Sequence, residues 1–247
     1  DVRRATDIPV KTLPSRIEGL EKPAADVAVL TLRLPATEMF QFHAGQYVDI
    51  LLKDGKRRSF SIANPPHDAA TIELHVRHVP GGLFTDQVFS TMKVRDILRF
   101  NGPHGSFYLR ESDKPMILLA GGTGFAPIKS IVLETLHLEL QRPMHIYWGA
   151  RDRAGLYQYE VAEAWAAQYP HIQFIPVLSE PELTPGWSGR TGLVHEAVLA
   201  DFPDISGHEV YACGAPGMIA AARADYQGKG NLPEDAFFAD SFEFAAN

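Results

Sequence analysis

Cysteine is almost absent from this sequence, in which Cys213 is the one cysteine among 247 residues. A single thiol excludes a disulfide within the chain, and it excludes any iron–sulfur or zinc site assembled from cysteines of this chain. Because disulfides are rare in reducing compartments, this composition leads us to expect a cytoplasmic protein.

Long apolar segments and hydrolase motifs are missing as well. No apolar run approaches the ~18 residues that a membrane span needs, and no signal-peptide pattern is visible, so we expect no membrane contact. The segment Gly186-Trp187-Ser188-Gly189 lacks the spacing of a nucleophile elbow. Its spacing argues against nucleophilic hydrolysis.

The two halves of the chain differ in charge. Residues 1–110 contain 15 basic and 12 acidic residues, whereas residues 111–247 contain 8 basic and 18 acidic residues. This asymmetry predicts two domains that meet near residues 111–115. Because no basic stripe runs along the sequence, we expect no nucleic-acid partner.

Short β-type segments dominate the first half. Residues 1–14 contain two prolines and no clear periodicity, which predicts a linker. Residues 15–110 have the pattern of a small closed β-barrel, with a hairpin turn at Asp54-Gly55. The expected strands cover residues 28–34, 47–52, 58–62 and 71–77.

Strands and helices alternate in the second half. This alternation predicts an α/β domain over residues 111–247, with a doubly wound, mostly parallel sheet that binds ligands at the carboxyl ends of its strands. The expected strands cover residues 116–120, 145–149, 172–178, 209–213 and 236–242. The expected helices cover about 127–141, 160–168, 193–200 and 216–226.

A glycine-rich turn, Gly121-Gly122-Thr123-Gly124, separates the first of these strands from the next helix. Glycines let the backbone approach a ligand closely, and free N–H groups at a helix start favour an anion such as a pyrophosphate. The turn is no Walker A loop, because Ile128 occupies the position of that motif's glycine. A turn that only packs a helix on a strand is the alternative.

A second motif, Arg58-Ser59-Phe60-Ser61, lies in the first half. It resembles the Arg-x-Tyr-Ser flavin motif of the ferredoxin reductase family, with phenylalanine replacing tyrosine. The resemblance implies a six-stranded antiparallel flavin-binding barrel in which Arg58 pairs with a flavin phosphate. It also implies that Phe60 stacks near the isoalloxazine and that Ser61 hydrogen-bonds the N5 edge. The phenylalanine keeps the ring and lacks one hydroxyl.

Two further segments match the flavin-binding part of the family. They are His75-Val76-Arg77 and Gly81-Gly82-Leu83-Phe84-Thr85. The glycine pair is expected to let backbone amides and the Thr85 hydroxyl reach a pyrophosphate, which favours FAD over FMN. His75 and His78 are three apart on a strand and point to opposite faces, so we expect no metal site.

In the second half, the resemblance assigns Gly122, Thr123 and Gly124 to the pyrophosphate of a pyridine nucleotide. Arg151 ends a predicted strand, where it either contacts the dinucleotide or remains solvated. Ser179 and Glu180 suit a free ribose 2′-hydroxyl, which favours NADH over NADPH. Arg190, ten residues after Glu180, is the alternative partner for a 2′-phosphate.

The segments near Cys213 and at the C-terminus complete the match. Cys213-Gly214 belongs to the family's Cys-Gly-x-Pro segment, which implies a thiol beside the nicotinamide. Asp240 would be the acidic group near the redox centre, and Phe242 an aromatic shield over the flavin. Ser61, Cys213 and Asp240 are therefore the predicted catalytic residues. An inert buried cysteine and plain edge-strand packing are the alternatives for Cys213 and the C-terminal segment.

The resemblance covers about residues 10–245 and is strongest to the CDP-6-deoxy-glucoseen reductase-like group. It implies an NADH-dependent reductase that passes a hydride to FAD and then single electrons to a [2Fe-2S] centre. Members of the group carry that cluster on a ferredoxin domain. We therefore expect the cluster on a removed domain or on a partner, with an oxygenase or dehydrase downstream.

Two other functions fit parts of the sequence. Asp240-Ser241-Phe242 also resembles the end of free flavin reductases, which release reduced FMN or riboflavin. A flavin-binding module without turnover is the other alternative. The second nucleotide motif argues against such a module, because it would need no second nucleotide.

Overall fold

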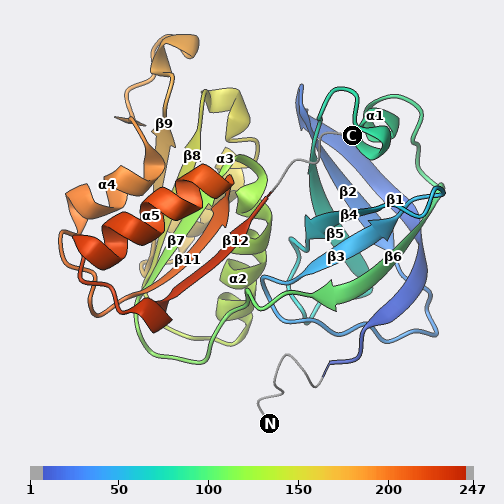
Figure 1. Cartoon of the computed structure of the whole chain (residues 1–247), viewed down its shortest axis with the longest axis horizontal. Coiled ribbons are helices and arrows are strands. Elements are labelled where there is room, and N and C mark those ends of the chain that lie inside the picture. The colour runs from blue at the N-terminus through green and yellow to red at the C-terminus, as the bar shows by residue number, and fades with distance from the viewer. Residues whose placement is uncertain (1–7, 243–247) are drawn as a thin grey trace. The chain divides into compact units, whose positions relative to one another are not determined.

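The computed structural model describes residues 8–242, which form two compact units (Figure 1). Residues 8–110 and Lys129–Leu138 make up the first unit, and residues 111–128 and 139–242 make up the second. Residues 1–7 of the predicted linker and residues 243–247 of the predicted second domain lie outside the described residues.

The first unit is a six-stranded antiparallel sheet with the strand order β4-β3-β6-β1-β2-β5. A bridge between Ile62, just after β4, and Leu74 of β5 joins the two edges, so that the sheet closes into a barrel. The all-β barrel is thus confirmed. Its strands are β1 (Lys11–Ala24), β2 (Val27–Arg33), β3 (Tyr47–Leu51), β4 (Arg57–Ser61), β5 (Thr71–Arg77) and β6 (Ile97–His104), with one short helix, α1 (Leu83–Phe89).

Alternating apolar residues build the barrel core. Ile72, Leu74 and Val76 of β5 are fully buried, together with Leu30 of β2 and Phe100 of β6. Each such side chain contributes about 1.5–3 kcal/mol of hydrophobic stabilisation. The hairpin turn between β3 and β4 is confirmed by Gly55, whose φ of 83° lies in the left-handed region that glycine adopts freely.

Strand β1 begins earlier than the sequence indicates. Residues 11–14, predicted as linker, already belong to this strand and pair with β6. Leu13 and Ile17 point inward, and the proline that suggested a linker, Pro14, is exposed between them. Pairing with β2 begins only at Arg16. Pro14 therefore lies where β1 has one open side, and an open strand edge tolerates proline.

The second unit is a parallel six-stranded sheet with the order β10-β9-β8-β7-β11-β12. The predicted α/β alternation is confirmed. Its strands are β7 (Met116–Gly121), β8 (Met144–Ala150), β9 (Ile172–Leu178), β10 (Arg190–Thr191), β11 (Glu209–Gly214) and β12 (Phe237–Ser241). Its helices are α2 (Phe125–His137), which continues into the first unit, α3 (Tyr159–Gln168), α4 (Val194–Asp201) and α5 (Pro216–Gly228).

Helices cover both faces of this sheet. On one face, Tyr147 of β8 packs in a cluster with Val198 of α4 and Tyr226 of α5. On the other, the Trp148 ring stacks on Phe125 of α2 with centroids 4.0 Å apart. Successive residues of β8 thus point to opposite faces, and both are buried, which is typical of a doubly wound parallel sheet. No helix within residues 8–242 is long and apolar enough to cross a membrane.

The strand order places a topological switch between β7 and β11. From β7 the chain moves outward through β8, β9 and β10, and it then returns to the other side of β7 as β11. In open α/β sheets, ligands bind at the carboxyl ends of the strands that flank such a switch. The glycine-rich turn after β7 and the end of β11 are the segments at that position.

Candidate functional site

Strand β4 carries the predicted flavin motif. Phe60 is partly buried and packs against Phe84 of α1, with ring centroids 5.4 Å apart. Arg58 lies two residues before Phe60 on the same side of the strand. Its Nη1 donates to the Arg57 carbonyl oxygen at 2.9 Å. The structure thus brings Phe60 and Phe84, both predicted site residues, into contact within the barrel.

Ser61 ends β4 with an unused hydroxyl. The residue is 3% exposed, and its Oγ has no hydrogen-bond partner among the described residues. An unsatisfied buried polar group costs about 1–3 kcal/mol, so each such group calls for an explanation. A bound ligand that hydrogen-bonds this hydroxyl would provide one. The residue therefore fits the predicted role toward a flavin.

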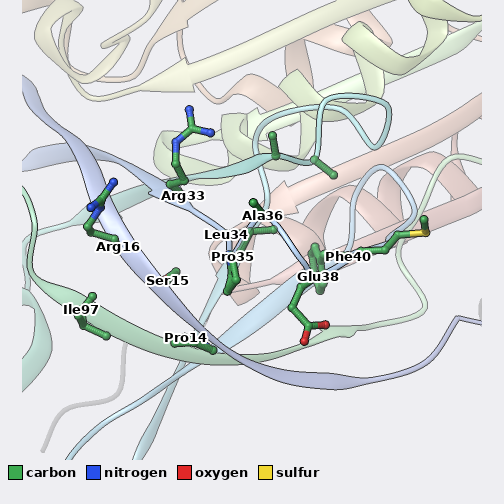
Figure 2. Close-up of a pocket in the computed structure, with 13 residues that line it drawn as sticks. Pro14, Ser15, Arg16, Arg33, Leu34, Pro35, Ala36, Glu38, Phe40 and Ile97 are labelled. Carbon is green, nitrogen blue, oxygen red and sulfur yellow. The ribbon is translucent and has the colours of Figure 1, made fainter.

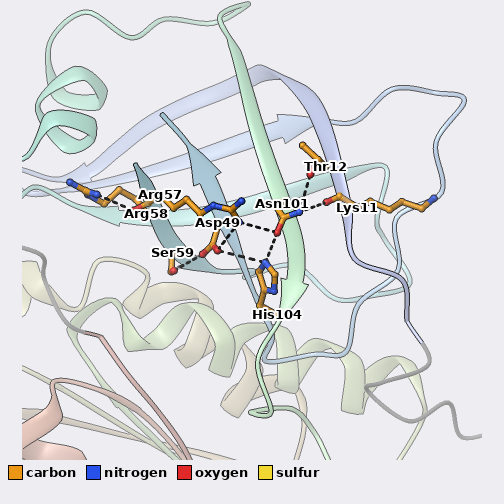
Figure 3. A network of polar contacts seen from close by, with 8 residues as sticks. All are labelled: Lys11, Thr12, Asp49, Arg57, Arg58, Ser59, Asn101 and His104. Carbon is orange, nitrogen blue, oxygen red and sulfur yellow. Dashed lines mark hydrogen bonds and ion pairs between the residues drawn. The ribbon is translucent and has the colours of Figure 1, made fainter. Parts of the chain in front are cut away.

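Ser59 belongs to a polar network around Asp49 (Figure 3). Because successive side chains of a strand alternate, Ser59 faces the opposite side of β4 from Phe60. Its Oγ donates to Asp49 Oδ1 at 2.6 Å. The Asp49 carboxylate also lies 3.6 Å from His104 Nε2 and 3.7 Å from Arg57 Nη1. The Arg58 side chain extends away from this network (Figure 3). Ser59 therefore has a partner within the barrel, in contrast to Ser61.

The glycine pair after β5 forms a tight turn before α1. Gly81 has a φ of 85°, and the Gly82 amide donates to the Val79 carbonyl oxygen at 2.8 Å. Thr85 Oγ1 donates to the same carbonyl at 2.9 Å and accepts from the Val79 amide at 3.1 Å. The Thr85 hydroxyl thus stabilises the turn in this structure, and its contact with a pyrophosphate stays a prediction. Leu83 is exposed.

The side chains of the predicted flavin segment His75-Val76-Arg77, at the end of β5, point in different directions. The His75 side chain is fully buried, with Nε2 2.8 Å from Glu73 Oε2, and Val76 is part of the barrel core. Because both side chains are buried, neither can contact a flavin in this conformation. Only the backbone of these two residues could do so. Arg77 is exposed. His78 contacts a different carboxylate, that of Asp86, at 2.8 Å.

Glu73 is held by two basic groups. Besides His75, it contacts Lys129 Nζ at 2.9 Å, within the first unit. Burial opposes the negative charge, but the His75 hydrogen bond and the Lys129 charge prevail, so that the pKa of Glu73 falls to about 2. Burial in turn lowers the pKa of His75. We therefore read this group as a charged Glu73–Lys129 pair with a neutral imidazole beside it.

In the second unit, the turn after β7 packs tightly on the end of β11. Gly122 has a φ of 55°, and its carbonyl oxygen accepts a hydrogen bond from Trp148 Nε1 at 2.9 Å. A Cβ on Gly124 would lie 2.1 Å from the Cys213 carbonyl oxygen. Only glycine permits this approach. Thr123, 7% exposed, lies between the two glycines.

Cys213 and Asp240 are direct neighbours. They pair in register across the parallel strands β11 and β12. Burial raises the pKa of the fully buried Cys213 thiol, and the Asp240 charge raises it further. Burial also raises the pKa of Asp240 to about 6. The thiol is thus neutral near pH 7 and suits a packing or orienting role better than a nucleophilic one.

The residues that follow are tied to the same strand end. The Phe242 amide donates to the Gly214 carbonyl oxygen at 2.9 Å. Gly214 has a φ of 158°, and the Cε atom of Met218 would lie 2.7 Å from a Cβ added there. The structure therefore brings four predicted residues together at the carboxyl ends of β11 and β12. They are Cys213, Gly214, Asp240 and Phe242.

Arg151, a predicted contact of the dinucleotide, and Glu180, a predicted contact of the adenosine ribose, form an ion pair between Nε and Oε2. They follow β8 and β9, which are adjacent in the sheet, and the Glu180 amide donates to the Arg151 carbonyl oxygen at 3.0 Å. The neighbouring Ser179 is exposed. Arg190, the alternative phosphate partner, is bound to Asp201 with both Nη1–Oδ distances at 3.0 Å.

Two structural residues escaped the sequence analysis. Asn64 follows the flavin motif, and its amide group makes three hydrogen bonds of 2.7–2.8 Å to the backbone of Asp68, Thr71 and Glu73. Trp148 fixes the glycine turn through its indole N–H. Asn64-Pro65-Pro66 directly after a strand was an available turn signal. The Trp148 contact joins segments 26 residues apart, and no local pattern indicates it.

A groove of about 820 Å³ lies elsewhere on the barrel (Figure 2). Arg16 and Arg33 lie at one end of it, and Pro14, Leu34, Pro35 and Phe40 contribute apolar walls. None of its lining residues belongs to the predicted flavin motifs. This groove is therefore separate from the predicted flavin site.

Comparisons with known proteins match both units. The family model of the oxidoreductase FAD-binding domain matches residues 15–108. That of the oxidoreductase NAD-binding domain matches residues 118–224. These ranges contain the flavin motif and the glycine turn, respectively.

Curated relatives extend over nearly the whole chain. The CDP-6-deoxy-L-threo-D-glycero-4-hexulose-3-dehydrase reductase of Yersinia pseudotuberculosis is 46% identical over 232 residues, covering 94% of this chain and 69% of that protein. Reductase component 2 of terephthalate 1,2-dioxygenase from a Comamonas species is 40% identical, covering 94% and 68%.

A solved structure shows the same arrangement of elements. The cytochrome P450 reductase of Amycolatopsis has a TM-score of 0.88 and 31% identity, covering 95% of this chain and 71% of that one. Sequence motifs, fold and relatives thus agree. The chain is a member of the ferredoxin reductase family and combines an FAD-binding with an NAD-binding part.

Proposed function

We propose that this protein is an NADH-dependent reductase that transfers a hydride to FAD and then delivers single electrons to a [2Fe-2S] centre on another domain or protein. One observation carries the proposal: the same chain holds an FAD-binding and an NAD-binding part, each with its motif. When bound, FAD accepts one hydride, which carries two electrons, and gives these electrons up one at a time. The protein supplies binding and orientation.

On the barrel, which we propose as the FAD domain over residues 15–110, each motif residue has a role. Arg58 is the cation for a flavin phosphate, and Phe60 offers one ring face. The unpaired Ser61 hydroxyl hydrogen-bonds the flavin near N5. After β5, exposed Arg77 and the backbone of residues 81–85 hold the pyrophosphate. These contacts favour FAD that is retained by the protein.

In the second unit, which we propose as the NAD(P)H domain over residues 111–247, the nucleotide lies across the carboxyl ends of the strands. Backbone amides at Gly122, Thr123 and Gly124 bind the pyrophosphate. The nicotinamide lies toward the neutral Cys213 thiol, which must become accessible when the nucleotide binds. Asp240, with a pKa of about 6, sets the polarity there.

NADH is preferred over NADPH because both arginines proposed for the adenosine end, Arg151 and Arg190, already pair with carboxylates. Glu180 already pairs with Arg151, and Asp201 pairs with Arg190. A 2′-phosphate at this edge would meet the Glu180 carboxylate, whereas a 2′-hydroxyl can donate a hydrogen bond to it. The paired state of Arg190 argues against the alternative that it reaches back to a phosphate.

The electron acceptor is proposed from the relatives. One of them is named as a dehydrase reductase and another as a dioxygenase reductase component. We infer that a ferredoxin-type [2Fe-2S] domain or protein receives the electrons here and passes them to an oxygenase or a dehydrase. With Cys213 as the one cysteine, this chain itself cannot ligate such a cluster.

The visible spectrum of the purified, desalted protein tests this function. We expect flavin bands that survive desalting and bleach under anaerobic NADH much faster than under NADPH. A colourless protein that reduces added FMN or riboflavin would instead establish the free flavin reductase. Flavin bands that persist under both nucleotides would leave a binding module without hydride transfer.

A further inference from the structure

The Arg151–Glu180 pair occupies the part of the sheet edge where the adenosine ribose of the proposed dinucleotide belongs. The sheet order runs β9-β8-β7-β11, with the pyrophosphate turn after β7 and Cys213 at the end of β11. Neighbouring strands are about 4.8 Å apart. A dinucleotide whose nicotinamide lies toward β11 must therefore extend its other half over the ends of β8 and β9, where Arg151 and Glu180 stand.

Both partners are open to a ligand. The Arg151 side chain is 69% exposed and the Glu180 side chain 39%. An exposed ion pair of this kind contributes little to the stability of a fold. The pair therefore has no strong structural reason to exist at this position. A guanidinium, in contrast, is the preferred side chain for binding a phosphate through two parallel hydrogen bonds.

The other arginines of this edge are also neutralised, but by contacts within the fold. Arg153 pairs with Glu160 and lies over the Tyr159 ring, with its Cζ 3.8 Å from the centroid. Arg190 is held by Asp201. Arg151 differs from them because its side chain is the most exposed of the three arginine side chains.

We propose that Arg151 is a latent 2′-phosphate ligand and that Glu180 masks it. Removing the Glu180 charge would free the guanidinium for the 2′-phosphate of NADPH and would also remove the carboxylate that repels this phosphate. The cofactor preference would then reside in one carboxylate, since the cation that NADPH requires is already in place. This inference rests on the proposed function, because it assumes that the dinucleotide binds across these strand ends.

The substitution Glu180→Gln tests it, because glutamine keeps the size of the side chain and removes the charge. The probes are adenosine 2′,5′-bisphosphate and adenosine 5′-monophosphate, which differ by the 2′-phosphate alone. Calorimetric titration of the flavin-containing protein gives both affinities without any turnover. We expect the variant to gain roughly tenfold in affinity for the bisphosphate relative to the monophosphate, the size typical of one new charged hydrogen-bonding contact.

Two further variants show whether Arg151 is responsible. Glu160→Gln removes the same charge beside Arg153 and should leave the ratio of the two affinities at its original value. The double variant Arg151→Met/Glu180→Gln should lose most of the gain and keep only the smaller part that comes from the removed repulsion. An unchanged ratio in Glu180→Gln would overturn the proposal, as would an equal gain in Glu160→Gln or an undiminished gain in the double variant.

The rate of flavin bleaching separates this inference from the proposed function. If NADH bleaches the flavin in the unsubstituted protein but Glu180→Gln gains nothing for the bisphosphate, the masking proposal alone fails. If NADH does not bleach the flavin and neither adenosine nucleotide binds, the proposed function fails and the inference falls with it.

Discussion

At the scale of single residues, Ser61 allows a structural role to be separated from a functional one, because its buried hydroxyl has no hydrogen-bond partner among the described residues. Replacing an unsatisfied buried hydroxyl by a methyl group removes a penalty, so Ser61→Ala should leave the flavin-free protein as stable as before or more stable by about 1 kcal/mol. The same change should slow flavin reduction by NADH by about tenfold, which corresponds to one lost hydrogen bond in the transition state. Chemical denaturation and stopped-flow absorbance measure the two effects.

Ser15→Ala is the matched control for that prediction. Ser15 is another buried serine of the barrel, but its Oγ donates to the Leu98 carbonyl oxygen at 2.7 Å. Its loss should cost about 1 kcal/mol and leave the reduction rate unchanged. If Ser61→Ala destabilised the flavin-free protein as Ser15→Ala does, the hydroxyl would have a structural partner and its assigned role would be wrong.

Asp240 gives a prediction with a defined pH window. Burial raises its pKa from 3.8 to about 6, so the folded state favours the protonated form. The associated stability is fully present below pH 3.8 and is lost as the pH rises through 6. Asp240→Asn should therefore stabilise the protein by about 3 kcal/mol at pH 8 and by only about 1 kcal/mol at pH 4.5. Denaturant titrations at both pH values measure this, and an equal effect at both would contradict the raised pKa.

The residue scale also shows where sequence reasoning stops. Gly124 was identifiable because a glycine-rich turn after a strand has a known physical use. The Ser61 role came from the resemblance, and its orphaned hydroxyl became visible only in the structure. Neither the Thr85–Val79 contact nor the full burial of His75 was predictable, because each depends on how neighbouring segments fold onto the residue.

At the scale of elements, the turn between β7 and α2 is the part of the nucleotide site that tolerates least change. A methyl group on Gly124 would overlap the Cys213 carbonyl oxygen. Gly124→Ala should therefore push the turn away from β11, cost about 1–3 kcal/mol of stability and raise the KM for NADH, while the flavin content stays the same. Steady-state kinetics and the flavin-to-protein absorbance ratio measure these effects.

Gly217→Ala serves as the control for Gly124→Ala. Gly217 lies in the first turn of α5, and a Cβ there would meet nothing within 4 Å. The substitution should be neutral or slightly stabilising, because alanine restricts the unfolded chain more than glycine does. A KM for NADH that rises equally in both variants would show that the tight contact with Cys213 is not the cause.

Elements with a clear period were the predictable ones. The alternation in Thr71–Arg77 and the strand–helix rhythm after Met116 gave boundaries close to those of the structure. Strand β1 was missed in part because prolines masked its alternation, and β6 because Gly102-Pro103 interrupts it. The seven-residue helix α1 is too short to show a helical period. For the two strands, pairing with neighbouring strands outweighed the local propensity.

At the scale of the whole molecule, the proposed function requires that a hydride passes from NADH to FAD held by this chain. The most direct test is stopped-flow absorbance of the flavin band under anaerobic conditions, with NADH and with NADH deuterated at nicotinamide C4. We expect rapid bleaching by NADH and distinctly slower bleaching by the deuterated nucleotide, because the C4–H bond breaks as the flavin is reduced. A flavin that keeps its oxidised spectrum with NADH would contradict hydride transfer by this protein.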